Sequence, residues 1–168
     1  MVPDHAPIGA SRPADDGRAY HQAMAEFYDF DRANARLPEL SDLLLSLQSL
    51  KGEVVQLRDR IVELNAPVIA AAVAGTPAEA RISAEAAAET QRLRMRMQGL
   101  IDQMIATVAR IDEWGIKLRD IETGLVDFPA LASGRQVWLC WRLGEDRVEW
   151  WHELTTGVAG RQRLVDLT

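Results

Sequence analysis

Apolar residues recur every three or four positions along the first half of the chain, which is the period of a helix. Within the segment 40–64 the steps alternate between three and four, and leucine occupies every second position. This seam consists of Leu40, Leu43, Leu47, Leu50, Val54, Leu57, Ile61 and Leu64. A strand could not bury these residues on one face, so the pattern predicts a helix with a continuous buried stripe.

The residues that flank the seam predict where this first helix begins and ends. Asp31 is of a type that caps helix N-termini, so we expect the helix to begin there. Pro38 should kink the helix or split off its first turn, because proline lacks the backbone donor. The helix is expected to end near Asn65, because Pro67 disfavours helical geometry at the residue before it.

A second helix is predicted from Thr76-Pro77-Ala78-Glu79, which has the pattern of a capping box with proline at the first helical position. Gly115 favours its end. The apolar track between them is Ile82, Ala86, Leu93, Met97, Leu100, Ile101, Met104, Val108 and Ile111. The two helices, within 31–114, should fold back on each other as a long antiparallel, coiled-coil-like hairpin.

This hairpin has more apolar surface than one seam can bury. The additional apolar positions are Leu44, Leu45, Val55, Val62 and Leu100. A partner usually covers such a surplus, so we expect a homo-oligomer, a dimer or higher. The alternative is that both helices serve only as scaffold, since apolar heptads normally mark core.

After Gly115 the apolar pattern changes to the period of a strand. Ile116–Arg119 alternates, Thr123-Gly124 marks a turn, and Leu125–Pro129 is an extended segment that the proline should stop. The strongest strand signal spans 136–154 and predicts a hairpin that turns at Glu145-Asp146. The 116–154 region should therefore form a small antiparallel sheet, and the fold class is α+β.

The expected hairpin register follows from the pairs it creates. It sets Val137 against Leu154, Leu139 against His152, Trp141 against Trp150, Cys140 against Trp151 and Arg142 against Glu149. Aromatic pairs and opposite charges are favourable across strands, whereas a turn at Gly144-Glu145 would oppose Arg142 and Arg147. Because one hairpin is marginally stable alone, we expect it to pair with 116–119, 125–128 and 27–30.

Composition and charge fit one ordinary globular domain: the chain has 168 residues, 48% hydrophobic and 26% charged. The net charge of −6, without a basic block, argues against nucleic-acid and membrane-surface partners. The Pro- and Asp-containing segment 1–25 is expected to be a disordered arm, 26–163 a single α+β domain and 164–168 a tail. The lone Cys140 excludes an internal disulfide and favours a cytoplasmic location.

Five stretches are specific enough to be compared with known families: Phe30–Pro38, Gly124–Pro129, Val137–Glu145, Trp151-His152 and Gly157. Together they resemble a small bacterial family of the domain-of-unknown-function series, and the resemblance covers about residues 27–163. It implies no activity. It does imply that Asp127, Cys140, Glu145 and His152 belong to the family signature, whereas Trp150 and the N-terminal arm are particular to this chain.

Carboxylate, imidazole and thiolate groups gather in the predicted β region, at Asp127, Cys140, Glu145, His152 and Glu153. These groups are the usual ligands of zinc and other transition metals. We therefore take Asp127, Cys140 and His152 as candidate ligands of a divalent transition metal, and Asp127, Glu145 and His152 as candidate catalytic groups. The spacing matches no compact metal motif, so a buried, hydrogen-bonded His152 without chemistry remains the alternative.

For the cysteine and the tryptophans, a purely structural role is the alternative to a functional one. A nucleophilic Cys140 would need a neighbouring base, and the expected register places it and His152 on opposite faces of the hairpin. The indoles are candidates for a ligand or interaction surface, with sheet packing as the alternative. They are Trp138, Trp141, Trp150 and Trp151.

Two functions remain open from the sequence. The first is a homo-oligomeric binding or scaffold module with a Trp-rich surface for a small molecule or protein. The second is a small metal- or acid/base-dependent enzyme with a site built from Asp127, Glu145, His152 and Cys140. The first is slightly favoured, because helices occupy most of the chain and no catalytic spacing is met.

Overall fold

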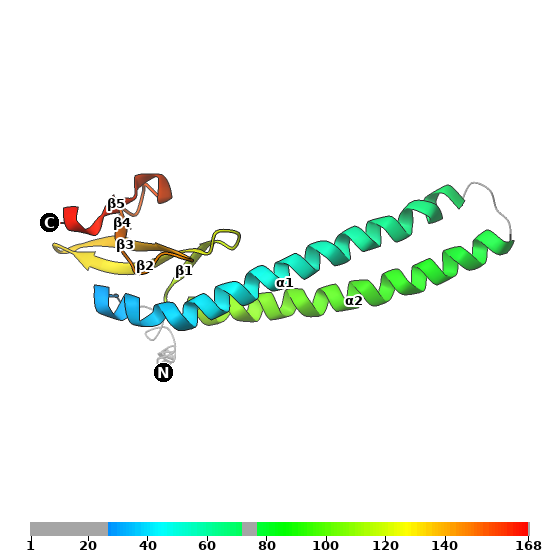
Figure 1. Cartoon of the computed structure of the whole chain (residues 1–168), viewed down its shortest axis with the longest axis horizontal. Helices are drawn as coiled ribbons and strands as arrows, with labels where there is room; N and C mark the ends of the chain where they lie inside the picture. The colour runs from blue at the N-terminus through cyan, green and yellow to red at the C-terminus, as the bar shows by residue number, and fades with distance from the viewer. Residues whose placement is uncertain (1–26, 72–76, 168) are drawn as a thin grey trace, which may run out of the picture.

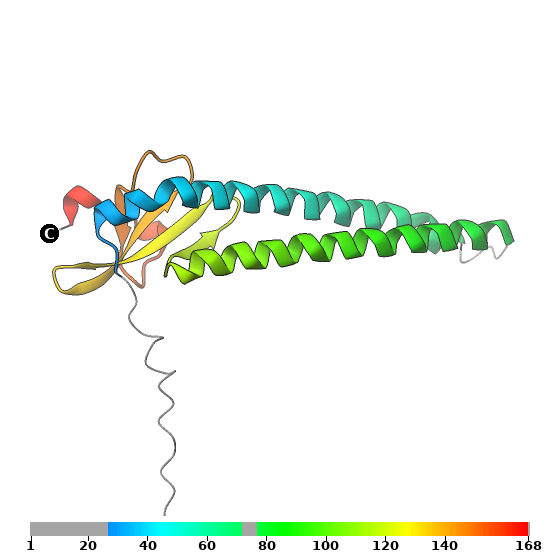
Figure 2. The ribbon, with the colours of Figure 1, turned by 90° about the horizontal axis from the view of Figure 1, so that it is seen from below.

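The computed structural model describes residues 27–71 and 77–167; the predicted arm 1–25 and Thr76 lie outside them. Two long helices, α1 (Phe30–Ala71) and α2 (Pro77–Glu113), run side by side in opposite directions and form a rod (Figure 1). A β-sheet packs at one end of the rod, beside the first turns of α1 (Figure 2). The predicted α+β fold, a helical hairpin followed by an antiparallel sheet, is confirmed.

Within the described residues the sheet has five strands in chain order, and every neighbouring pair is antiparallel. The elements are β1 (Lys117–Asp120), β2 (Leu125–Ala132), β3 (Arg135–Arg142), β4 (Trp150–His152), β5 (Gln162–Arg163) and the short 3-10 helices η2 (Val158–Gly160) and η3 (Leu164–Asp166). The two-residue β5 was not predicted, because so short a strand shows no alternation. No described helix is long and apolar enough to cross a membrane.

The helix ends agree with the sequence signals at three of the four termini, to within a residue or two, but the predicted cap of α1 is wrong. Asp29, not Asp31, caps α1: its Oδ1 accepts the backbone N–H of Arg32 at 2.8 Å. At the far end of the hairpin α2 begins at Pro77, and at the end beside the sheet Gly115 follows the last turn of α2 with a φ of 74°. Gly115 provides the local stop signal that lets the chain leave the rod and enter β1.

Neither proline interrupts α1. The helix is continuous through Pro38, and it continues past Pro67 to Ala71, so the expected end near Asn65 is wrong. A proline removes one helical donor, a cost that surrounding packing can offset. Beside Pro38, the buried Leu37 belongs to the hydrophobic core and holds the helix against the sheet.

Burial along the predicted seam depends on where the sheet is. Leu40 and Leu47 of the seam, together with Leu44 beside it, are fully buried where the sheet covers α1. Leu57 and Leu64 are half-buried where the described cover is α2. All eight seam positions are buried or half-buried, so the predicted stripe is confirmed. Leu44 was expected to be surplus apolar surface, and it is instead a core residue under the sheet.

β2 does not stop at Pro129, as the sequence suggested, but continues to Ala132. The pairing with β1 begins at Lys117 opposite Asp127, so the β1 side of β2 is unpaired at the proline, where no strand donor is required. The backbone N–H of Tyr28 fills part of this edge by donating to the carbonyl oxygen of Pro129 at 2.7 Å. The segment before α1 thus touches the sheet without forming a strand.

The predicted register of the 136–154 hairpin is wrong by one residue: Trp138 pairs with His152, and Cys140 with Trp150. The chain turns between Arg142 and Glu145 and then leaves the sheet until Trp150. A tertiary contact accounts for this path. The side chain of Val148 is fully buried, and its backbone N–H donates to Oδ1 of Asn34 on α1 at 3.0 Å.

The two faces of the sheet differ in what they carry. The face toward α1 is apolar and includes Val126, Phe128, Val137, Leu139, Trp141 and Trp151. Alternate residues of the same strands point to the opposite face. The C-terminal segment 164–167, assigned to a tail by sequence, also contacts the core through Leu164 and Leu167.

Candidate metal centre

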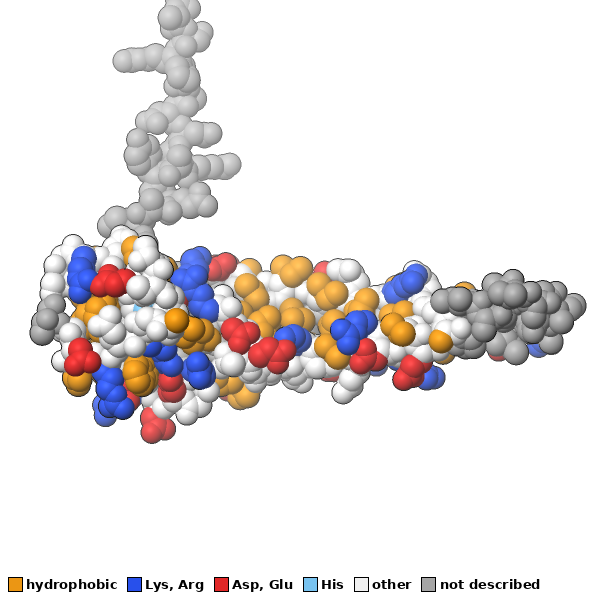
Figure 3. Space-filling model, turned by 90° about the horizontal axis from the view of Figure 1, so that it is seen from above, with side chains coloured by type: hydrophobic (Ala, Val, Ile, Leu, Met, Phe, Trp, Pro, Cys, Tyr) orange, Lys and Arg blue, Asp and Glu red, His pale blue; other side chains and the backbone are white. Residues whose placement is uncertain are grey.

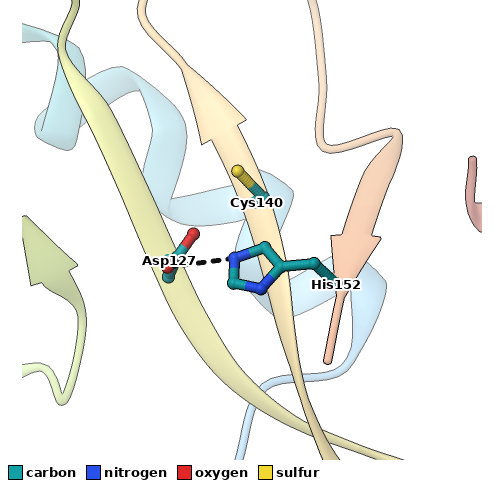
Figure 4. Close-up of side chains that lie close together, drawn as sticks. All are labelled: Asp127, Cys140 and His152. Carbon is teal, nitrogen blue, oxygen red and sulfur yellow. Dashed lines mark ion pairs between the residues drawn. The ribbon is translucent and has the colours of Figure 1, made fainter. Parts of the chain in front are cut away.

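Three side chains with metal-ligating atoms come from three neighbouring strands. Asp127 of β2 lies opposite Cys140 of β3, and His152 of β4 lies opposite Trp138, which is two residues from Cys140 on the same face of β3. Residues that oppose each other in a sheet project to the same face, so all three point away from α1 (Figure 4). The one-residue change of register brings His152 to the face of Cys140, which corrects the expectation that they lie on opposite faces.

Asp127 and His152 meet across the intervening strand. Oδ2 of Asp127 is 3.2 Å from Nε2 of His152 and accepts a hydrogen bond from Nε of Arg119 at 2.7 Å. The ligating atoms of Asp127, Cys140 and His152 all lie within 4.8 Å of one another. The three residues are 2%, 0% and 1% exposed, respectively, so the group is shielded from bulk water.

The other ring nitrogen of His152 determines what Nε2 can do. Nδ1 lies 2.8 Å from the backbone oxygen of Glu153, which can only accept, so Nδ1 carries a hydrogen. A bare Nε2 would then direct its lone pair at the Asp127 carboxylate, which is repulsive. A proton or a metal cation between the two atoms removes this repulsion. Histidines that bind metals through Nε2 are commonly oriented in this way by a carbonyl on Nδ1.

The Cys140 thiol is not reactive by itself. Burial raises its pKa to about 12; the Asp127 carboxylate contributes to the rise, and the Arg161 guanidinium opposes it. The thiol therefore keeps its proton near neutral pH, and the thiolate that acts as a nucleophile is scarce. A metal ion would replace this proton, because the ligand form of cysteine is the thiolate.

The spacing of His152 and Asp127 fits an ion of zinc size. Metal–ligand bonds of about 2.1 Å place two tetrahedral nitrogen or oxygen ligands about 3.4 Å apart. The observed separation of Nε2 and Oδ2 is 3.2 Å. Within the described part of the chain the group comprises three ligands, so these residues would leave one tetrahedral position of the ion open.

Two arginine–tryptophan stacks flank the triad. The Arg119 guanidinium lies 5.1 Å from the ring centre of Trp138, and that of Arg161 lies 4.9 Å from Trp150. Both indoles are half-buried on the face that carries the triad. Sequence reasoning missed both arginines: Arg119 is an ordinary exposed strand residue and Arg161 follows a short loop, so only the tertiary fold indicates their role.

Glu145 is not a member of the triad. Both of its carboxylate oxygens accept hydrogen bonds from Nη2 of Arg161 at 2.8 Å, and Oε2 also accepts the backbone N–H of Arg142 at 2.9 Å. Glu145 therefore approaches the site only through Arg161. Glu153, the other nearby acid, forms an ion pair with Arg135.

The four hairpin tryptophans do not form one surface. Trp141 and Trp151 are 2% and 3% exposed and lie in the core on the α1 side of the sheet. Trp138 and Trp150 lie on the other face, beside the triad. The shift of register explains this division, because Trp150 pairs with Cys140 and not with Trp141.

Comparisons with known proteins give a family but no activity. A model of the family described as "Uncharacterized conserved protein (DUF2203)" matches residues 26–164. No curated protein and no solved structure matches the chain. What the site does must therefore be argued from its own chemistry.

Proposed function

This chain belongs to the DUF2203 family of uncharacterized conserved proteins, and we propose that it binds a divalent transition metal of the zinc class through Asp127, Cys140 and His152. One observation carries the proposal. Three different ligand types, buried on adjacent strands, converge within 4.8 Å, and the Nδ1 contact of His152 directs Nε2 toward Asp127. Imidazole, thiolate and carboxylate together suit zinc and its neighbours.

The number of ligands among the described residues supports a metal-dependent activity more than a structural ion. Structural zinc sites are usually closed by four protein ligands, whereas zinc enzymes have three and keep the fourth position for water or substrate. Glu145 does not enter this proposal as acid or base, because Arg161 holds both of its carboxylate oxygens. A thiolate ligand in a chain with one cysteine fits a reducing compartment, for which we propose the cytoplasm.

Elemental analysis of the purified full-length chain tests the metal site. We expect about one zinc-class ion per chain, and its loss in Cys140→Ser and His152→Gln, because each substitution removes one ligand. Glu145→Gln and Glu153→Gln are matched controls, because each changes an acid that neighbours the triad. Neither acid is a proposed ligand, so both variants should retain the ion. A folded chain that takes up no zinc, cobalt or manganese from solution would reject the proposal.

Exposed apolar side chains on the rod support a second proposal, that the hairpin is also a homo-oligomerisation surface. Hydrophobic and charged side chains intermix along the rod in Figure 3. The large exposed hydrophobic residues of the two helices are Phe30, Leu45, Val55, Val62, Met95 and Ile105. A second copy of the chain would remove this surface from water.

Light scattering coupled to size exclusion tests the oligomer. We expect a discrete dimer or higher oligomer, and a lower mass in Val62→Glu and Ile105→Glu, which place a charge on the surface. Gln56→Glu adds a charge at an exposed polar position of α1 and is the control. A clean monomer of the unaltered chain at micromolar concentration would discard this second proposal.

A further inference from the structure

Two buried polar atoms near the triad have no hydrogen-bond partner among the described residues. They are Oδ1 of Asp127, which can only accept, and Nε of Arg161, which can only donate. The Asp127 carboxylate interacts with the Cys140 thiol only while that thiol keeps its proton, and a metal ion would replace this proton. A buried polar atom without a partner costs free energy, and in native proteins an ordered water usually satisfies it. Both groups also act electrostatically on the Cys140 thiol, so they lie on the same side of the site. A water molecule held between them would donate to the first and accept from the second.

Arg161 is fixed beside the site by contacts that leave Nε free. Its Nη2 atom is bound by Glu145, and its guanidinium lies over Trp150, the strand partner of Cys140. The side chain is only 13% exposed. Ion pairing and stacking therefore use the end and the face of the guanidinium, and the Nε–H group remains available to a ligand.

The balance of charge favours an anion in this place. The two positive charges of a zinc-class ion are offset by the Cys140 thiolate and the Asp127 carboxylate, and Glu145 offsets Arg161. Because Asp127 is already counted against the ion, the positive charge of Arg119, which binds Asp127, is left without an offsetting negative charge. A buried site with a net positive charge binds a negative ligand more strongly than a neutral one.

Resting on the proposed metal site, we infer that an exchangeable water molecule occupies the fourth position of the ion, donates to Asp127 Oδ1 and accepts from Arg161 Nε. Small anions replace this water. The metal contacts the oxygen Oδ2 that already faces His152, which leaves Oδ1 for the water. Arg161 is then a positioning residue for the exogenous ligand, and the site takes a small anionic group of a substrate in that position.

Azide binding to the cobalt(II)-loaded full-length chain tests the inference, because visible absorption of cobalt responds to its ligands. In the unaltered protein azide should change the spectrum and saturate. Arg161→Gln should weaken azide binding about tenfold or more, because a charge-assisted donor is lost. Arg161→Lys should recover part of the loss through its charge.

Two controls separate the binding of the anion by Arg161 from the structural role that Arg161 has through its ion pair with Glu145. Glu145→Gln removes the acid that Arg161 pairs with but leaves the guanidinium, so azide should bind as well as before or better. Arg163→Gln removes a guanidinium that also lies over Trp150, at 5.4 Å, and should have no effect. If Arg161 acted only through its ion pair with Glu145, Glu145→Gln would weaken azide binding as much as Arg161→Gln does.

The outcomes are distinguishable. Cobalt that binds with a spectrum insensitive to azide would overturn the inference and leave the metal site intact. Azide affinity that is equal in Arg161→Gln and the unaltered chain would overturn the role of Arg161. A chain that binds no cobalt would overturn the metal proposal and, with it, this inference. Circular dichroism on each variant establishes that the fold is retained.

Discussion

Asp127 and His152 face each other across β3, the strand that separates their own strands, with Oδ2 and Nε2 3.2 Å apart. Both side chains are almost completely buried, and neither polar group could be left there alone without a large desolvation cost. Each of the two side chains therefore depends on the other for its buried position. The same arrangement that satisfies them without metal also places two ligands at the separation that a tetrahedral ion requires.

Removing one partner of this pair should destabilise the metal-free protein strongly. For Asp127→Ala we expect a loss of about 3–5 kcal/mol in the free energy of unfolding, because His152 and Arg119 lose a buried acceptor. Asp112→Ala removes an exposed acid paired with Lys117 and should change stability little. Urea denaturation of both variants provides the comparison; equal losses would show that the buried pair has no special weight.

The stability of the metal-free protein should fall at alkaline pH because of Cys140. Its pKa is about 12 in the folded chain against 9.0 for a free thiol, so the unfolded chain releases the proton first. The stabilising contribution is complete below about pH 9 and is lost as the pH rises toward about 12, at up to about 1.4 kcal/mol per unit. Cys140→Ala removes this contribution.

Denaturation of the chelator-treated protein across this alkaline range measures the effect. The two proteins differ only at this position, so the informative quantity is the difference in the free energy of unfolding between the unaltered chain and Cys140→Ala. That difference should be constant below about pH 8 and should shrink above about pH 9. A constant difference throughout would contradict the burial of a protonated thiol.

Two glycines with similar backbone angles should respond differently to substitution. Gly124 and Gly134 have φ values of 60° and 78°, which disfavour any side chain by about 1 kcal/mol. A Cβ on Gly124 would lie 2.5 Å from Cβ of Leu143, whereas one on Gly134 would meet open space. Gly124→Ala should therefore cost about 1–3 kcal/mol more than Gly134→Ala in thermal or chemical unfolding. Equal costs would mean that Leu143 moves freely.

The helical hairpin was predictable because its signals are local and repeated. The seam from Leu40 to Leu64 contains eight apolar positions, so no single exception obscures the period. Pro77 and Gly115 mark two of the helix ends by their own backbone restrictions. The prediction that the helix ends near Asn65 was wrong, because a proline disfavours a helix without forbidding it. Packing elsewhere along α1 decided the length of the helix.

The candidate site was predictable in its members but not in its geometry. Asp127, Cys140 and His152 were identified by ligand chemistry, yet their meeting depends on a register that local pair preferences assign wrongly. The Arg142–Glu149 pair favoured one alignment, but the contact between Val148 and Asn34, 114 residues apart, selects another. Arg161 gives no sequence signal, because its partners are Trp150 of β4 and Glu145 of the turn after β3, which only the tertiary fold brings to it.

Metal binding should release protons, which gives a last test that is independent of any activity. At about pH 7 the Cys140 thiol is protonated, since its pKa is about 12, so binding must displace that proton. The cation also takes the place of any proton held between Nε2 of His152 and Oδ2 of Asp127.

Calorimetric titration of the metal-free chain with zinc, repeated in buffers of different ionisation enthalpy, measures this release. The slope of the binding enthalpy against the ionisation enthalpy gives the number of protons released per ion. We expect a slope between one and two protons, together with an affinity that rises about tenfold per pH unit for each proton. Glu145→Gln should give the same slope, because Glu145 is not a ligand. A slope of zero would mean that the ion binds without the thiol, at a different place on the molecule.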